Sequence, residues 1–75
     1  MDVSALIAER LASGALPKAP PSGQWVGYGG SNNCDGCDLP IQAKQIEDEF
    51  AFADGQRIHL HRYCTNEWTK QRSQS

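Results

Sequence analysis

Two pairs of residues constrain this chain more than any other feature of its sequence. Cys34 and Cys37 enclose two residues, and 23 residues further on His61 and Cys64 again enclose two, giving C-x2-C-x23-H-x2-C. Structural zinc takes four nitrogen or sulfur ligands in a tetrahedron, and short chains supply them as such pairs. We therefore predict that Cys34, Cys37, His61 and Cys64 bind one Zn²⁺ per chain. The alternative interpretation is three buried thiols and a surface histidine.

The chain length makes a metal site plausible on energetic grounds. A chain of 75 residues forms one small domain, whose core alone rarely supplies more than ~3–5 kcal/mol. Bound structural zinc contributes on the order of 10–16 kcal/mol near neutral pH. The three cysteines are an odd number, so they do not form a closed disulfide framework.

The sequence carries neither of the signals that direct a chain to or through a membrane. It lacks a basic N-terminal region followed by an apolar run, and no segment approaches the ~20 apolar residues of a membrane span. We therefore expect a cytoplasmic protein without a membrane partner, in a reducing compartment where thiolates stay available for metal.

The charge balance bears on the class of partner. The formal net charge is −2, and residues 34–75 hold seven acidic and five basic side chains. Nonspecific nucleic-acid binding rests on a basic patch, so this balance disfavours it. Local basic surface remains possible in the last third of the chain, at Arg57, Arg62, Lys70 and Arg72.

Residues 1–14 are predicted to form an N-terminal amphipathic helix. One apolar stripe at helical spacing is made by Val3, Leu6, Ile7 and Leu11. Asp2 can cap the start, and Gly14 can adopt the left-handed conformation at the end. Such a short helix is marginal alone, so it must dock either on its own domain or on a partner.

Residues 15–33 are predicted to be a loop or linker without regular structure. This segment holds three of the four prolines and the run Gly-Tyr-Gly-Gly, a composition typical of irregular chain. Trp25 and Tyr28 are unusual for a flexible tether. We expect them to pack on the metal-binding module, with an exposed aromatic contact for a partner as the alternative.

Residues 34–75 are predicted to be a zinc-binding module of knuckle, hairpin and helix. Residues 46–53 alternate as a half-buried strand, Asp54-Gly55 is a strong hairpin turn, and residues 57–60 form the return strand. A helix then begins at His61 and carries His61, Cys64 and Trp68 on one face. The side chains expected to face the core around Trp68 are Phe50, Phe52, Ile58 and Leu60.

Two titratable residues near the predicted ligands, His59 and Arg62, have more than one interpretation. His59 competes with His61 as the fourth ligand, although the H-x2-C spacing favours His61. Arg62 either offsets the charge of the thiolates or is an ordinary solvated cation. The acidic run Glu47-Asp48-Glu49 is expected to be a solvated sheet edge that blocks strand aggregation.

These motifs resemble those of treble-clef zinc fingers. The C-x2-C…H-x2-C half resembles the first zinc module of a LIM domain. The module is also similar to short bacterial zinc-finger proteins that share the opening Cys-x-x-Cys-x-x-Pro-Ile (residues 34–41), an Asp-Gly hairpin, a Leu-His-x-x-Cys close (residues 60–64) and a following Trp. The resemblance implies a metal-stabilised fold and carries no established activity.

The sequence departs from these relatives at two points. It ends too soon for the second zinc module of a LIM domain. Zinc knuckles often place glycine directly after the second cysteine, whereas Asp38 occupies that position and Gly36 lies inside the pair. Asp tolerates the left-handed region better than most residues, so we expect a slightly altered knuckle.

The sequence therefore predicts a small α+β zinc-stabilised domain with a treble-clef-like knuckle, a β-hairpin, a C-terminal helix and an N-terminal amphipathic helix. With four protein ligands the zinc would be closed to substrate, so we expect a structural site and no enzyme. The predicted function is an adaptor that binds another protein. A regulatory nucleic-acid-binding finger is the alternative, and a thiol switch at the cysteines ranks last.

Overall fold

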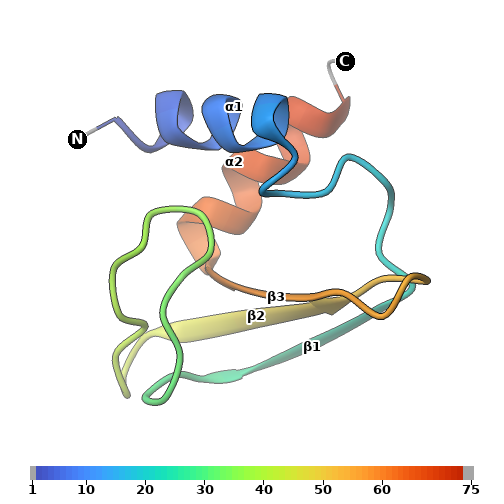
Figure 1. Cartoon of the computed structure of the whole chain (residues 1–75). Coiled ribbons are helices and arrows are strands. Elements are labelled where there is room, and N and C mark those ends of the chain that lie inside the picture. The colour runs from blue at the N-terminus through green and yellow to red at the C-terminus, as the bar shows by residue number, and fades with distance from the viewer. Residues whose placement is uncertain (1, 74–75) are drawn as a thin grey trace.

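Two helices and three strands make up the fold, and the computed structural model describes residues 2–73. In chain order they are α1 (Val3–Ser13), β1 (Gly23–Tyr28), β2 (Ile46–Ala51), β3 (Arg57–His61) and α2 (Arg62–Ser73). The outermost positions of the predicted segments 1–14 and 34–75, residue 1 and residues 74–75, lie outside the described residues. The two helices form one layer above the sheet (Figure 1). This arrangement confirms a small α+β fold.

The sheet is antiparallel with strand order β1-β2-β3, so β2 is its central strand. Its register pairs Tyr28 with Ile46 on one side and Glu47 with His61 on the other. The prediction that the acidic run 47–49 forms a sheet edge is therefore wrong. The backbone of β2 forms hydrogen bonds with a strand on each side, β1 and β3. Because β1 was not predicted from the sequence, β2 could not be recognised as the central strand.

Strand β1 also corrects the expectation for residues 15–33. Residues 23–28 pair along their whole length with β2, although glycines and prolines surround them. Short-range composition predicted irregular chain, but the long-range partner supplies the hydrogen bonds that stabilise a strand here. The expectation that Trp25 and Tyr28 pack on the metal-binding module is wrong: the two residues are 52% and 78% exposed.

The predicted hairpin is confirmed. Gly55 has a φ of 92°, and its N–H donates to the Phe52 carbonyl at 2.9 Å. Strand β2 ends at Ala51, two residues earlier than predicted, because the Phe52 N–H already bonds to the Gln56 carbonyl across the turn (3.0 Å).

Trp68 lies at the centre of the core, between the two layers. Its ring makes edge contacts with Phe50 and Phe52, with centroid separations of 4.9 and 6.2 Å. Its indole N–H donates to the Pro17 carbonyl at 3.0 Å, so the loop after α1 is held against the same ring. The predicted inward positions of both hairpin strands are buried, at Phe50, Phe52, Ile58 and Leu60.

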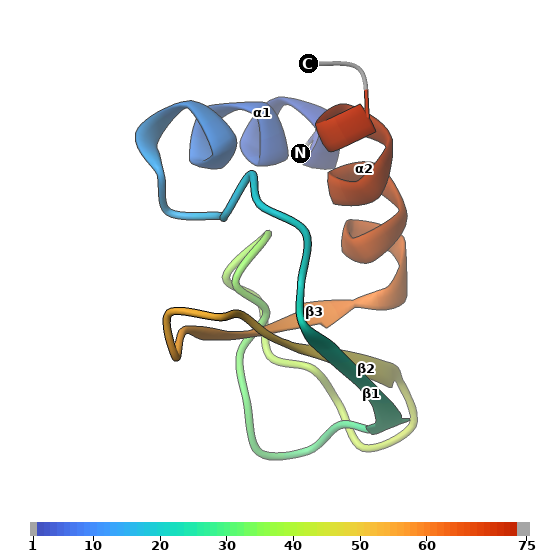
Figure 2. The same cartoon turned by 90° about the vertical axis from the view of Figure 1, so that its right-hand side faces the viewer.

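Helix α1 docks on its own domain and crosses α2, as Figure 2 shows. Ile7 and Leu11 are buried in the core, with Val3 and Leu6 partly buried beside them. The predicted ends are confirmed: the Asp2 carboxylate accepts the Ser4 N–H at 3.0 Å, and Gly14 is left-handed. The apolar stripe of α1 is therefore covered by its own domain, and it is not left exposed for a partner protein. Neither helix among residues 2–73 has the length and apolar character needed to cross a membrane.

Candidate metal centre

The first pair of predicted ligands lies in a tight turn between β1 and β2. The Asp38 N–H donates to the Cys34 carbonyl, and the Cys34 N–H donates to the Leu39 carbonyl, both at 2.9 Å. Asp38 has a φ of 67°, which is the left-handed conformation expected for it. The knuckle therefore closes with aspartate where glycine is the usual choice.

The second pair lies where β3 becomes α2. His61 is the last residue of β3 and Cys64 lies in the first turn of α2, so the helix begins one residue later than predicted. All four side chains are buried, and their ligand atoms lie within 4.8 Å of one another. Within the cluster, the Cys37 Sγ and the His61 Nδ1 lie 3.4 Å apart. The structure thus brings together all four residues that the sequence singled out.

The dimensions of this cluster fit one tetrahedral metal ion. With metal–sulfur bonds of about 2.3 Å and metal–nitrogen bonds of about 2.0 Å, two ligand atoms of one tetrahedron are separated by roughly 3.5–3.8 Å. The Cys37–His61 separation of 3.4 Å is close to that spacing, and 4.8 Å bounds the others. Three sulfur atoms and one imidazole nitrogen are also ligands that a soft or borderline transition metal prefers.

The imidazole of His61 is oriented by acceptors outside the cluster. Its Nε2 lies 3.2 Å from the Pro40 carbonyl and 3.1 Å from the Gln45 Oε1. Both partners accept hydrogen bonds, so the proton belongs on Nε2 and the lone pair of Nδ1 faces the thiols. Metal-binding histidines are typically fixed in this way by a carbonyl or carboxylate on the other nitrogen.

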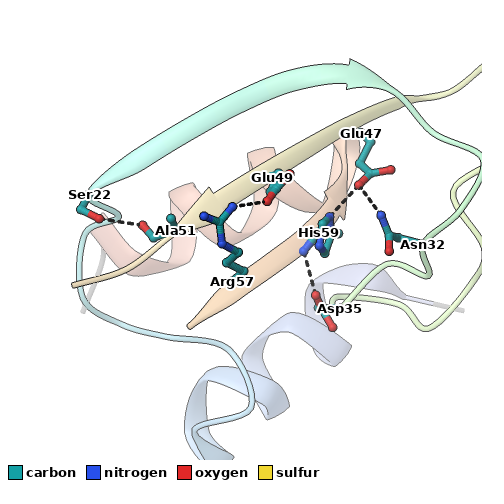
Figure 3. A network of polar contacts seen from close by, with 8 residues as sticks. All are labelled: Ser22, Asn32, Asp35, Glu47, Glu49, Ala51, Arg57 and His59. Carbon is teal, nitrogen blue, oxygen red and sulfur yellow. Dashed lines mark hydrogen bonds and ion pairs between the residues drawn. The ribbon is translucent and has the colours of Figure 1, made fainter. Parts of the chain in front are cut away.

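His59 lies outside the cluster, as the spacing indicated. Its Nδ1 lies 2.6 Å from Glu47 Oε2, and its backbone N–H donates to the Asp35 carboxylate at 2.7 Å. Figure 3 shows the His59 ring beside Glu47 and the Asp35 carboxylate beside the backbone of His59. The carboxylate of Asp35 therefore joins the knuckle to β3, a role that sequence reasoning missed.

The pKa values of Cys34 and Cys64 are shifted in opposite directions. The Cys64 thiol hydrogen-bonds to the Cys34 sulfur and lowers the pKa of Cys34 to about 4, and the backbone N–H groups of His61 and Gly36 add to this effect. The same contact, together with burial, raises the pKa of Cys64. The groups that point at the Cys34 sulfur are therefore a neighbouring thiol and backbone N–H groups rather than a cationic side chain.

Arg62 does not face the thiols. Its guanidinium makes a two-point contact with Asp48, with Nε–Oδ2 and NH2–Oδ1 distances of 2.8 and 3.0 Å. Hydrogen bonding to that carboxylate raises the pKa of Arg62. Asp48 is fully buried. Both interpretations of Arg62 are therefore replaced by a structural ion pair between α2 and the central strand.

Tyr63 is a neighbour of the site that sequence reasoning missed. Its ring stacks on the His61 imidazole with a centroid distance of 4.8 Å, and its hydroxyl lies 3.6 Å from the Cys37 sulfur. Partial burial and the hydrogen bond with Cys37 raise the pKa of Tyr63. The only available signal was its position inside the H-x2-C pair.

The N-terminal helix closes the other side of the knuckle. A Cβ atom on Gly36 would lie 2.9 Å from the Ile7 Cδ1 and 3.2 Å from the Cys64 sulfur. Arg10 reaches the same turn, with a 2.6 Å ion pair to Asp38 and a bond to the Asp35 carbonyl. Residues far apart in sequence thus seal the cluster from solvent.

Comparison with known proteins found no relative of this chain. No protein-family model matches the chain, and neither a curated protein nor a solved structure matches it.

Proposed function

We propose that this protein is a small treble-clef-like zinc finger whose single Zn²⁺ is structural and whose role is to bind another protein. One observation carries the metal assignment: four buried side chains from two distant segments converge with their ligand atoms within 4.8 Å. Zinc is the metal that most often occupies a closed site of three cysteines and one histidine.

A structural role follows from the completeness of the ligand set. Four protein ligands fill a tetrahedron and leave no position for water or substrate, whereas a catalytic zinc keeps one open. The metal would instead tie the knuckle to the start of α2, which a core this small needs. We therefore propose no enzymatic activity. A reducing compartment, the cytoplasm, would keep the three thiols available.

Support for a protein partner comes from the surface that the fold leaves exposed. Trp25, Val26 and Tyr28 of β1 are all more than half exposed. Large aromatic residues are enriched where proteins contact one another. The formal net charge of −2 is compatible with a protein partner and unfavourable for a phosphate backbone.

The nucleic-acid alternative loses part of its support in the structure. Arg62 is committed to Asp48, Arg72 lies over the Trp68 ring at 4.1 Å, and Thr65 is buried. Arg62 and Arg72 are two of the four basic residues in the last third of the chain, and both are therefore already engaged. Binding of DNA or RNA with a steep dependence on salt would restore this alternative.

Native mass spectrometry with metal analysis on the same sample tests the metal assignment. We expect one zinc per chain and a loss of mass on chelation that coincides with loss of folded structure. A folded protein with three free thiols and no metal would refute the proposal. Cross-linking in a cell extract then tests the adaptor role. We expect the zinc-loaded protein to be cross-linked to another protein even when the reaction is run at high salt.

A further inference from the structure

One edge of the sheet is closed by the knuckle and the other is open. At the β3 edge, the Asp35 N–H donates to the His59 carbonyl at 2.8 Å, and the Asp35 carboxylate accepts the His59 N–H. At the β1 edge, within residues 2–73, no segment pairs with the strand. The fold therefore covers one edge and exposes the other.

The backbone groups that face outward on β1 can be assigned from the register. The Gly29 N–H donates to the Gln45 carbonyl at 3.0 Å, just beyond the Tyr28–Ile46 pair. In an antiparallel ladder, the backbone N–H and C=O groups of successive residues point alternately toward the partner strand and away from it. The N–H and C=O groups of Gln24, Val26 and Tyr28 consequently point away from β2, spaced as an added strand requires.

This edge lacks the features that normally prevent strand addition. Proteins usually protect an edge strand with charged residues, proline or a bulge. Residues 23–28 read Gly-Gln-Trp-Val-Gly-Tyr and contain neither a charge nor a proline. Four of the six large exposed hydrophobic residues of the described chain lie here and at the start of β2: Trp25, Val26, Tyr28 and Ile46.

Beside the edge, the sheet surface is hollowed over Gly27. A Cβ atom at Gly27 would meet no atom within 4 Å. The hollow has a volume of about 240 Å³, and its walls include Trp25 and the acidic side chains of Glu47 and Glu49. It can therefore receive one long side chain from a strand placed alongside β1.

The charge around the hollow selects the type of side chain. The residues that line the hollow include two carboxylates, those of Glu47 and Glu49, and no basic side chain. Arg57 already pairs with Glu49 at 2.7 Å and lies 5.4 Å from the Trp25 ring centre. The molecule thus shows a cation resting between this ring and a carboxylate. The second carboxylate, Glu47, contacts His59 Nδ1 and the Asn32 amide through its Oε2.

We infer that β1 binds an extended segment of a partner protein as a fourth strand, with a lysine or arginine of that segment in the hollow over Gly27. This inference rests on the proposed adaptor role and deepens it. Main-chain hydrogen bonds would form with Gln24, Val26 and Tyr28, as in other cases of strand addition. The aliphatic stem of the basic residue would lie on Trp25, and its charge would face Glu47 and Glu49.

The first test uses the zinc-loaded full chain and a defined probe. The probe is the peptide acetyl-Thr-Val-Thr-Lys-Thr-Val-Thr-amide, and the control replaces its lysine by glutamate. Amide NMR titration is expected to shift residues 23–28, Glu47 and Glu49, and to slow hydrogen exchange at Gln24, Val26 and Tyr28. The glutamate peptide should bind at least about tenfold more weakly.

Two pairs of variants separate the backbone contribution from the charge contribution. Val26→Pro removes an outward N–H without touching the β1–β2 ladder, so the protein folds and peptide binding is lost; Val26→Thr keeps the N–H and should bind normally. Glu49→Gln should weaken binding several-fold, whereas Glu9→Gln, on the exposed face of α1, should leave it unchanged.

Several results would overturn the inference. They are absence of binding, equal binding of the two peptides, shifts centred on the helices, or unimpaired binding by Val26→Pro. A concentration-dependent dimer that Val26→Pro abolishes would instead assign the edge to a second copy. If a partner cross-links through α1 or α2, the inference fails while the proposed adaptor role stands. If no protein partner is found at all, the adaptor role itself fails.

Discussion

Gly36 of the knuckle lies directly against Ile7 of the N-terminal helix. A Cβ atom at position 36 would come within 2.9 Å of the Ile7 Cδ1 and within 3.1 Å of the Cys64 Cβ. The metal cluster and the apolar stripe of α1 therefore share one tightly packed boundary. Only glycine allows the chain between Cys34 and Cys37 to approach both neighbours this closely.

Gly36→Ala is predicted to destabilise the zinc-loaded protein by about 1–3 kcal/mol, the usual cost of an extra methyl group in a packed core. The Ile7 methyl group can move, but the Cys64 Cβ and Sγ are fixed by the ligand set. Gly27→Ala is the matched control, since its Cβ meets nothing within 4 Å. Chemical denaturation measures both variants, and equal midpoints would refute the close packing at Gly36.

Removal of the metal is predicted to unfold the described domain. Without an ion, the buried polar side chains of the cluster, three thiols and the His61 imidazole, lose the contact that holds the two segments together. Chelation should collapse the amide dispersion in NMR spectra, and added zinc should restore it. A chelated sample with unchanged dispersion would show that the core folds without metal.

His61→Ala is predicted to lower zinc affinity far more than His59→Ala. The His61 Nδ1 faces the thiols, whereas the His59 ring is bonded to Glu47 outside the cluster. Competition with a chromophoric chelator measures both affinities. Equal losses would mean that the ligand assignment is wrong or that both histidines bind.

The ion pair between Arg62 and Asp48 is predicted to respond asymmetrically to substitution. Asp48 is fully buried, while the Arg62 side chain is about half exposed. Arg62→Gln therefore leaves a buried carboxylate without its cation, but Asp48→Val leaves a guanidinium that water can solvate. Thermal unfolding should show a larger loss for Arg62→Gln. A larger loss for Asp48→Val would contradict this assignment.

Tyr63→Phe is predicted to loosen the hold on the metal without unfolding the protein. The phenyl ring can keep the stacking on His61, but the hydroxyl near the Cys37 sulfur is lost. Removing a partner of a metal ligand typically costs about 10–100-fold in affinity, and the 3.6 Å contact places the expected loss at the low end. Zinc affinity and the alkylation rate of Cys37 measure it. Lys70→Ala, a substitution on the last turn of the same helix, is the control. An unchanged affinity would leave Tyr63 with a packing role only.

The hairpin, both helices and the four clustered residues could be predicted because their signals are local. Asp54-Gly55 defines its own turn, α1 carries its own cap and left-handed end, and the C-x2-C and H-x2-C pairs each fix their spacing along the chain. The metal chemistry needs only that such pairs meet, and no other thiols compete for the same role.

What the local signals could not supply was the identity of distant partners. Residues 23–28 become a strand only because β2 offers a complete ladder, and this addition turns the acidic run into the centre of the sheet. Asp48 is buried because Arg62 arrives from α2, an encounter that strand alternation cannot reveal.

The sequence by itself determined the donor set, the hairpin, the helices and the order in which they follow one another. Those features depend on residue chemistry and on spacing within a few residues. The tertiary structure alone decided that α1 seals the knuckle, that backbone N–H groups rather than Arg62 point at the Cys34 sulfur, and that β1 exposes Trp25 at an open edge. Each of these outcomes depends on the pairing of segments far apart in the chain, which residue spacing does not encode.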